Sequence, residues 1–225
     1  MPATPLVVFG ASNFVSDVFD AAMALGLVPR CVVLHLPESR GDRDVPLSER
    51  VAALAAHGVK IAIQSMQEFE ARDGDAYFLG PTTPARRVLV EEVRQRFGIR
   101  FRSLVHPAAY VSPLATIGEG VFIGANAVVA AGARCHDFSL LNRGATVGHD
   151  TELGAYSRVQ PGATVCSLSR VGTAVTIGAG ATLVERLRIG DSAYVAAGAV
   201  VVNDVEPGTL VAGVPARFVK ALPSM

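Results

Sequence analysis

One six-residue unit of the chain carries the side chains best suited to proton transfer. The unit runs from Ala145 to Asp150, and its last two residues are His149 and Asp150. Histidine has the unperturbed pKa nearest neutrality, so its ring can accept and release a proton in every turnover. An adjacent carboxylate can orient the ring and stabilise its protonated form. The pair favours a general base, and the alternative from composition alone is a solvated histidine at a surface turn.

The unit belongs to a long repeat. From Ala109 to Asp204 the chain consists of sixteen consecutive six-residue units without an insertion. The third residue of each unit is aliphatic or cysteine, and the first is usually small. An α-helix repeats every 3.6 residues and a strand every 2, so a period of six fits neither. It predicts a coil with three flat faces, in which each face is a short strand and each corner a turn.

The register of the coil predicts where His149 lies. Three units make one turn, so the repeat predicts about five coils, stacked about 4.8 Å apart in a rod on the order of 25 Å long. The third positions point inward, and Gly, Asn and Asp positions form the corners. Val147 is a third position, so His149 falls at a corner, where side chains leave the prism.

The chain before residue 105 lacks the six-residue period and alternates strands with helices. This alternation predicts a small parallel sheet covered by helices. The first strand-to-helix turn has only Gly10 where a dinucleotide fingerprint has three glycines. The free N–H groups at a helix N-terminus still suit a phosphate. The predicted strands are residues 6–10, 31–36, 59–63 and 75–80, and the predicted helices are 14–25, 48–57 and one that opens at Pro84.

The chain therefore divides into three predicted parts. Residues 1–105 form the strand–helix domain, residues 106–206 the stacked coils, and residues 207–225 a C-terminal cap over the last coil. A cap is expected because an open coil end would expose unpaired strand edges.

Composition limits the partners. The chain has 20 basic and 20 acidic residues, so its charge gives no sign of nucleic acid or an anionic membrane as a partner. The first residues do not read as a signal peptide, and no apolar run approaches the roughly 18 residues of a membrane span. Three cysteines are an odd number and suggest buried free thiols in a reducing compartment. We expect a cytoplasmic protein.

The segment GATVGHDTELGAYSRVQPGA, residues 144–163, resembles a signature of the hexapeptide-repeat acyltransferases. The resemblance is to the branch with UDP-N-acetylbacillosamine N-acetyltransferases and sialic acid O-acetyltransferases. It extends over the whole chain, including VAGVPARFVK at residues 211–220. It implies an N-terminal Rossmann-like domain followed by a left-handed parallel β-helix. It further implies a homotrimer in which acetyl-CoA lies in the groove between two β-helices.

The resemblance also assigns roles to individual residues. It makes His149 the base that deprotonates the acceptor and Asp150 the group that raises its basicity. The implied activity is an acetyl-CoA-dependent N-acetyltransferase that acts on the amino group of a nucleotide-linked amino sugar, without a metal. The remaining implied positions are Arg158, Ala179 and Ala197 for CoA, and Ser12, Asn13 and Gly80 for the nucleotide sugar.

The chain departs from the family in the acceptor pocket. Its first turn reads Ser12-Asn13-Phe14, where members usually have Gly-Gly-His or Ser-Gly-His. Its second predicted strand ends in His35-Leu36, where members often have two aspartates able to hold a ribose or base. These differences concern which nucleotide binds and leave the acetyl-transfer residues intact.

Three other functions are compatible with parts of the pattern. An O-acetyltransferase of a sialic acid or another sugar hydroxyl would use the same residues. A γ-class carbonic anhydrase shares the prism but needs three histidines around one zinc ion, and the repeat has only His136 and His149. A non-catalytic scaffold or ice-binding rod would require a flat ladder of matched polar side chains, whereas the outward side chains of this repeat are of mixed types.

Overall fold

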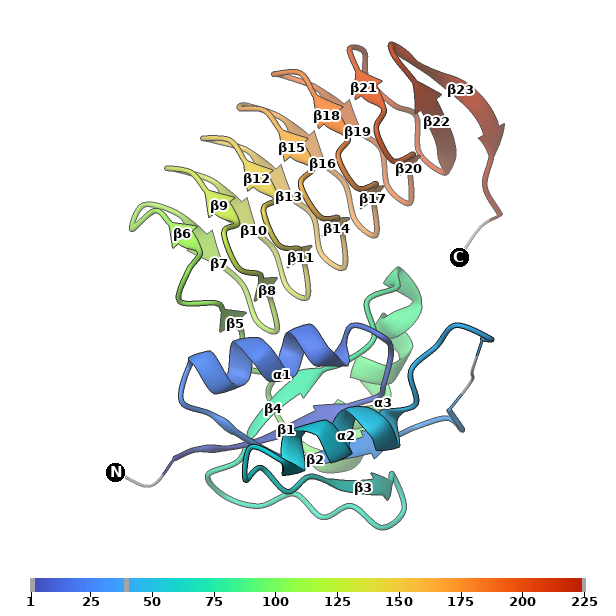
Figure 1. The fold of residues 1–225 in the computed structure, drawn as a ribbon. Helices are drawn as coiled ribbons and strands as arrows, with labels where there is room; N and C mark the ends of the chain where they lie inside the picture. The colour runs from blue at the N-terminus through green and yellow to red at the C-terminus, as the bar shows by residue number, and fades with distance from the viewer. Residues whose placement is uncertain (1–2, 39–40, 224–225) are drawn as a thin grey trace. The chain divides into compact units, whose positions relative to one another are not determined.

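The computed structural model describes residues 3–38 and 41–223 (Figure 1). It divides the chain into two compact units, the first ending at Leu104 and the second beginning at Val105.

The first unit contains a four-stranded parallel sheet with the strand order β3-β2-β1-β4. This is the order of the first four strands in a doubly wound dinucleotide-binding sheet. Its interior strands are apolar and buried because helices cover a parallel sheet on its faces. The strands are β1 (Pro5–Phe9), β2 (Val28–Leu34), β3 (Ala62–Ser65) and β4 (Ala76–Leu79).

In the described part of this unit, α1 connects β1 to β2, α2 connects β2 to β3, and α3 follows β4. The last helix ends at Gly98, whose φ of 64° is the left-handed conformation that glycine adopts without steric cost. The strand predicted at 59–63 begins only at Ala62, because Val59 N–H donates back to the Leu54 carbonyl at the end of the preceding helix. The helices are α1 (Val15–Ala24), α2 (Leu47–Ala55) and α3 (Arg87–Phe97), the last preceded by the 3₁₀ turn η1 (Pro84–Arg86).

The second unit is a stack of two-residue strands that recur every six residues, as Figure 1 shows from β6 to β21. Each strand inside the stack pairs in parallel with the strands eighteen residues before and after it; Thr146, for example, pairs with Val128 and Thr164. The predicted parallel stack is therefore confirmed. The strands are β5 (Leu104–Val105), β6 (Tyr110–Val111), β7 (Thr116–Ile117), β8 (Phe122–Ile123), β9 (Val128–Val129), β10 (Arg134–Cys135), β11 (Leu140–Leu141), β12 (Thr146–Val147), β13 (Glu152–Leu153), β14 (Arg158–Val159), β15 (Thr164–Val165), β16 (Arg170–Val171), β17 (Thr176–Ile177), β18 (Thr182–Leu183), β19 (Arg188–Ile189), β20 (Tyr194–Val195) and β21 (Val200–Val201).

The strands form three sheets, which we call the first, second and third in the order in which the chain visits them. The first sheet holds β5, β8, β11, β14, β17 and β20. The second sheet holds β6, β9, β12, β15, β18 and β21, and the third holds β7, β10, β13, β16 and β19. The described part of the C-terminal tail extends the first sheet: β22 (Thr209–Gly213) pairs in parallel with β20, and β23 (Ala216–Ala221) pairs antiparallel with β22.

The second residue of each short strand points into the stack. From Ile123 to Val201 every residue in this third-position column is at most 3% exposed. From Val121 to Ala199 the first positions are buried as well, which explains why most of them are small. The hydroxyls of Thr151, Ser157 and Ser169 bond to the next coil; Ser157 Oγ, for example, donates to the Gly172 carbonyl at 2.6 Å. Ser139 Oγ is also buried but has no hydrogen-bond partner among the described residues. The core of this unit is therefore two inward columns rather than one.

The corners require a left-handed backbone conformation that the residue types of the repeat do not reveal. The sixth residue of most units has a positive φ whether or not it is glycine, and Asp150 has a φ of 54°. The N–H of such a residue donates to the corner of the preceding coil, as Asp150 N–H does to the Ala131 carbonyl at 3.0 Å. These hydrogen bonds offset the steric cost of the left-handed conformation.

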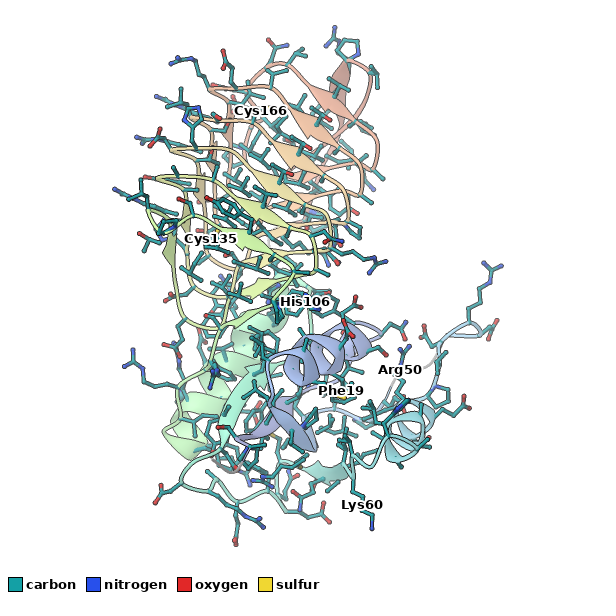
Figure 2. All side chains as sticks on the ribbon, turned by 60° about the vertical axis from the view of Figure 1, so that its left-hand side comes forward. Phe19, Arg50, Lys60, His106, Cys135 and Cys166 are labelled. Atoms are coloured by element: carbon teal, nitrogen blue, oxygen red, sulfur yellow. The ribbon has the colours of Figure 1, made fainter. Side chains whose placement is uncertain are left out.

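All three cysteines are free thiols, but they are not equally buried. Cys31 and Cys135 are fully buried, and burial raises their pKa values to about 11 and about 12. Cys166, labelled in Figure 2 with Cys135, is only half-buried, contrary to the expectation that all three thiols are enclosed.

The stack predicts a sharp contrast between the two residues of one strand. Leu183 is completely buried in the inward column, so Leu183→Ala should lower the free energy of unfolding by about 2–5 kcal/mol. Thr182 precedes it in β18 and points outward, so Thr182→Ala should change it by less than about 1 kcal/mol. Chemical denaturation followed by circular dichroism measures both. Equal effects would contradict the inward and outward assignment.

Candidate active site

His149 lies at an exposed corner between the second and third sheets, after β12 and before β13. Its Nδ1 is 2.9 Å from Asp150 Oδ2, and the two side chains are 55% and 60% exposed. A hydrogen bond from Nδ1–H to the carboxylate would fix the tautomer and leave Nε2 with a free lone pair. The ring therefore faces solvent rather than the packed interior, and its outer nitrogen can accept a proton.

The backbone around His149 is held by the next coil. Leu168 N–H donates to the His149 carbonyl at 3.0 Å, and Thr151 Oγ1 donates to the Cys166 carbonyl at 3.1 Å. A Cβ at position 148 would lie 2.5 Å from Ser167 N, so glycine is needed for the two coils to approach at this corner. The histidine is thus presented by a rigid turn.

His136 is also followed by an aspartate in the sequence, but this aspartate makes a different contact from that of Asp150. His136 stands beside Asp137, but at a different corner, between the third and first sheets. Asp137 Oδ1 accepts the Glu119 N–H at 2.9 Å and therefore serves the packing of two coils. Asp150, in contrast, directs an oxygen to the imidazole of its neighbour.

The residues assigned to CoA lie elsewhere on the prism. Ala179 and Ala197 are exposed and stack eighteen residues apart at the corner between the first and second sheets. Arg158 is half-buried on the first sheet. His149 and the two alanines therefore occupy opposite edges of the second sheet, and one copy of the chain does not bring them together.

The first unit contains a cavity of about 350 Å³ beside the ends of β1 and β2. The predicted residues Ser12 and Asn13 both line it. Arg50, labelled in Figure 2, extends from α2 and donates to Asn13 Oδ1 at 2.7 Å. Hydrogen bonds from Gly41 N–H and the Asn13 side chain lower the pKa of Asp44, another lining residue. The cavity wall therefore combines segments that are far apart in sequence.

Gly80 does not line this cavity, but it fixes the turn that does. Ser12 Oγ donates to the Gly80 carbonyl at 3.0 Å and accepts the Phe14 N–H at 3.3 Å. A Cβ at position 80 would lie 2.2 Å from the Gly10 carbonyl oxygen. Position 80 must therefore be glycine for the chain after β4 to pass this turn. Gly80 therefore acts on the pocket through Ser12.

Sequence reasoning noted His35 only as a departure from the family. The structure places it in the wall of the same cavity, with its Nδ1 buried and without a hydrogen-bond partner among the described residues. Burial lowers its pKa, and the charge of Glu92 acts in the opposite direction. The position of His35 directly after a buried strand was the signal available in the sequence, because open parallel sheets bind ligands at the carboxyl ends of their strands.

No group of three or more His, Cys, Asp or Glu side chains in residues 3–38 and 41–223 is arranged to hold a metal ion. Over the same ranges, no helix combines the length and the apolar character that crossing a bilayer requires.

Comparison with known proteins identifies the class. No protein-family model and no curated protein sequence matches the chain. Solved structures match it over nearly its whole length, and they are acetyltransferases with stacked parallel strands. The predicted resemblance to the hexapeptide-repeat, acetyl-CoA-dependent sugar acetyltransferases is confirmed by these neighbours.

The matching structures are similar to this chain in both sequence and fold. The acetyltransferase domain of PglB from Neisseria gonorrhoeae is 29% identical, with a TM-score of 0.80, and covers 96% of this chain and 100% of its own; it has also been solved with acetyl coenzyme A. PerB from Caulobacter crescentus, in complex with CoA and GDP-perosamine, is 27% identical, with a TM-score of 0.76 and coverage of 96% and 97%. WeeI from Acinetobacter baumannii, at 21% identity, a TM-score of 0.73 and coverage of 95% and 99%, shares the fold.

The turn at Gly80 gives a prediction for the first unit. Gly80→Ala should destabilise this unit by about 1–3 kcal/mol, because the new Cβ forces the ends of β1 and β4 apart. Ser12→Ala removes the hydrogen bond without a clash and should cost about 1 kcal/mol. Denaturation curves of the two variants provide the measurement. If Gly80→Ala is as stable as the parent protein, the close approach is not a constraint.

Proposed function

We propose that this protein is an acetyl-CoA-dependent N-acetyltransferase that acts on the amino group of a nucleotide-linked amino sugar, with His149 as the general base. The observation that carries the proposal is the 2.9 Å contact between His149 Nδ1 and Asp150 Oδ2 at an exposed corner. The match to PerB, solved with CoA and GDP-perosamine, supports the substrate class. The strand order of the first unit supports a Rossmann-like module for the nucleotide, and the neighbours support a left-handed coil.

The proposed reaction is direct transfer. The lone pair of the acceptor amine attacks the thioester carbonyl carbon, and a tetrahedral intermediate forms. His149 Nε2 takes a proton from the amine nitrogen, while Asp150 stabilises the imidazolium. Collapse of the intermediate breaks the carbon–sulfur bond and releases CoA as a thiolate, which takes up a proton. The product is an N-acetylated sugar nucleotide.

The same corner offers a donor for the oxyanion. Ser167 lies one coil beyond His149, and its backbone N–H donates no hydrogen bond to any of the described residues. At three corners elsewhere in the stack, the equivalent N–H is used by a side-chain oxygen; Asp191 Oδ1, for example, accepts the Thr173 N–H at 2.7 Å. The Ser167 N–H is thus available to stabilise negative charge on the thioester oxygen.

The proposed site needs more than one copy of the chain. His149 and the alanines assigned to CoA lie at opposite edges of the second sheet, so a groove shared between copies is required to combine them. Charge on the outward strand positions is unevenly distributed, which favours this assembly. The third sheet carries Arg134, Glu152, Arg170 and Arg188, whereas among the two-residue strands of the other two sheets the only charged side chain is that of Arg158. We propose a homotrimer in which the first and second sheets face neighbouring copies.

The nucleotide is proposed to bind in the cavity of the first unit, beside Ser12 and Asn13 and at the turn that Gly80 supports. The fully buried thiols Cys31 and Cys135 suit a reducing environment, and we propose that the enzyme acts in the cytoplasm.

His149→Ala should reduce kcat by about 10²–10⁴-fold, because general-base assistance typically contributes that much. The affinity for CoA should stay within about twofold, since the ring contacts the acceptor rather than CoA. Acetyl-CoA with a panel of amino-sugar nucleotides, followed by release of free thiol, gives both parameters.

His136→Ala is the matched control, because it removes a corner histidine that also stands beside an aspartate. It should leave kcat unchanged. Near-normal turnover of His149→Ala would end the assignment, and turnover of sugar hydroxyls but not amines would convert it to O-acetylation.

The assembly is tested separately. Light scattering should give three times the 23.4 kDa mass of one chain. His149→Ala and Ala197→Trp should each inactivate their own homotrimers, and co-expression should restore part of the activity, because mixed assemblies contain some intact grooves. A monomer at micromolar concentration, or no complementation, would contradict a shared site.

A further inference from the structure

The sequence places the same tripeptide at two equivalent points of the repeat. Ser-Arg-Val occurs at 157–159, which ends in β14, and again at 169–171, which ends in β16. In both copies the valine is buried and the arginine takes the outward position. Arg170, on the third sheet, is exposed, whereas Arg158, on the first sheet, is half-buried. Identical local sequences therefore hold two guanidinium groups in different environments.

The contacts of Arg158 are unusual for a half-buried cation. Its Nε–H donates to Thr176 Oγ1 at 2.9 Å, and Tyr194, which pairs with Thr176 in the same sheet, also acts on the guanidinium. Both are hydroxyl side chains rather than carboxylates. Burial lowers the pKa of Arg158, and Tyr194 acts in the opposite direction. Elsewhere in the chain Arg30, also partly buried, is paired with Asp75.

This arrangement leaves strong donors without an anion. A guanidinium has five N–H donors, and one of those of Arg158 is used by Thr176. Removing a cation from water is unfavourable unless an opposite charge compensates for it. The described residues supply no such charge to Arg158. The remaining N–H groups lie in a planar fork, which matches the oxygens of a phosphate.

The height of Arg158 along the stack indicates which phosphate group it can bind, that of the acceptor or that of CoA. Arg158 follows His149 by nine residues, half of an eighteen-residue coil, which corresponds to about 2.4 Å along the axis. In an assembly of parallel copies, Arg158 of one copy therefore lies at the level of His149 in the next. The phosphate attached to a sugar is only a few bonds from an amine on the same ring. The diphosphate of CoA is separated from its thioester by the whole pantetheine chain.

We infer that Arg158 binds the phosphate next to the sugar in the nucleotide-linked acceptor and so holds the amine at the level of His149. The inference rests on the proposed function and gives Arg158 a different ligand from the CoA contact that the family resemblance implies. The guanidinium supplies a bidentate contact to the phosphate, and Thr176 fixes its orientation. No covalent step involves Arg158.

Calorimetric binding tests this without relying on acetyl transfer. The probes are UDP, GDP and dTDP, the matching nucleosides uridine, guanosine and thymidine, and CoA. The parent protein should bind one diphosphate more tightly than its nucleoside. Arg158→Gln should weaken that diphosphate by about 10–100-fold, while the affinities for the nucleoside and for CoA stay within about twofold. Arg158→Lys should fall between the two, since it keeps the charge but loses the fork.

Arg170→Gln is the matched control, because it removes the exposed arginine from the same tripeptide, and it should change none of these affinities. Circular dichroism checks that every variant is folded. A loss of CoA affinity in place of diphosphate affinity would overturn the inference, as would a parent protein that binds no diphosphate more tightly than its nucleoside. If Arg158→Gln weakens the diphosphate alone but the parent protein acetylates no amine, the proposed function is wrong and the assignment of Arg158 to phosphate binding stands.

Discussion

Every feature of the second unit depends on the register between one coil and the next. A strand of two residues has little stability of its own, and each is held by parallel pairing to strands eighteen residues away. The inward column stays continuous because this register never slips between Ile123 and Val201. A surface residue at a corner is therefore placed by the whole stack, and His149 owes its fixed position to hydrogen bonds from Leu168 and Thr151.

The regularity of the repeat made most of this unit predictable. The third-position column, the corners and the exposure of His149 all follow from a period of six. The left-handed corners were less visible, because Asp150, Tyr156 and Leu168 adopt positive φ without being glycine. In those cases pairing between coils overrides the preference of the residue, which a single sequence does not show.

The first unit was harder to predict in detail. Alternation of apolar and polar segments gave the strands and helices, but not where β3 starts, since Val59 first bonds back to the helix. The cavity wall joins Asn13 to Asp44 and Arg50, and such a contact depends on the fold rather than on spacing. Arg158 and Arg170 make the same point, because the tripeptide around them is identical and only the sheet to which each belongs separates them.

The three-sided coil also restricts how this chain can change length. Adding or removing a single six-residue unit between His149 and Ala179 would rotate all later residues by a third of a turn. Ala179 and Ala197 would then leave the corner that they share, while His149 kept its own. A gain or loss of eighteen residues would preserve every face and alter only the height of the stack. Insertions and deletions in relatives of this enzyme should therefore occur in whole coils, or in loops that project from a corner without entering the ladder.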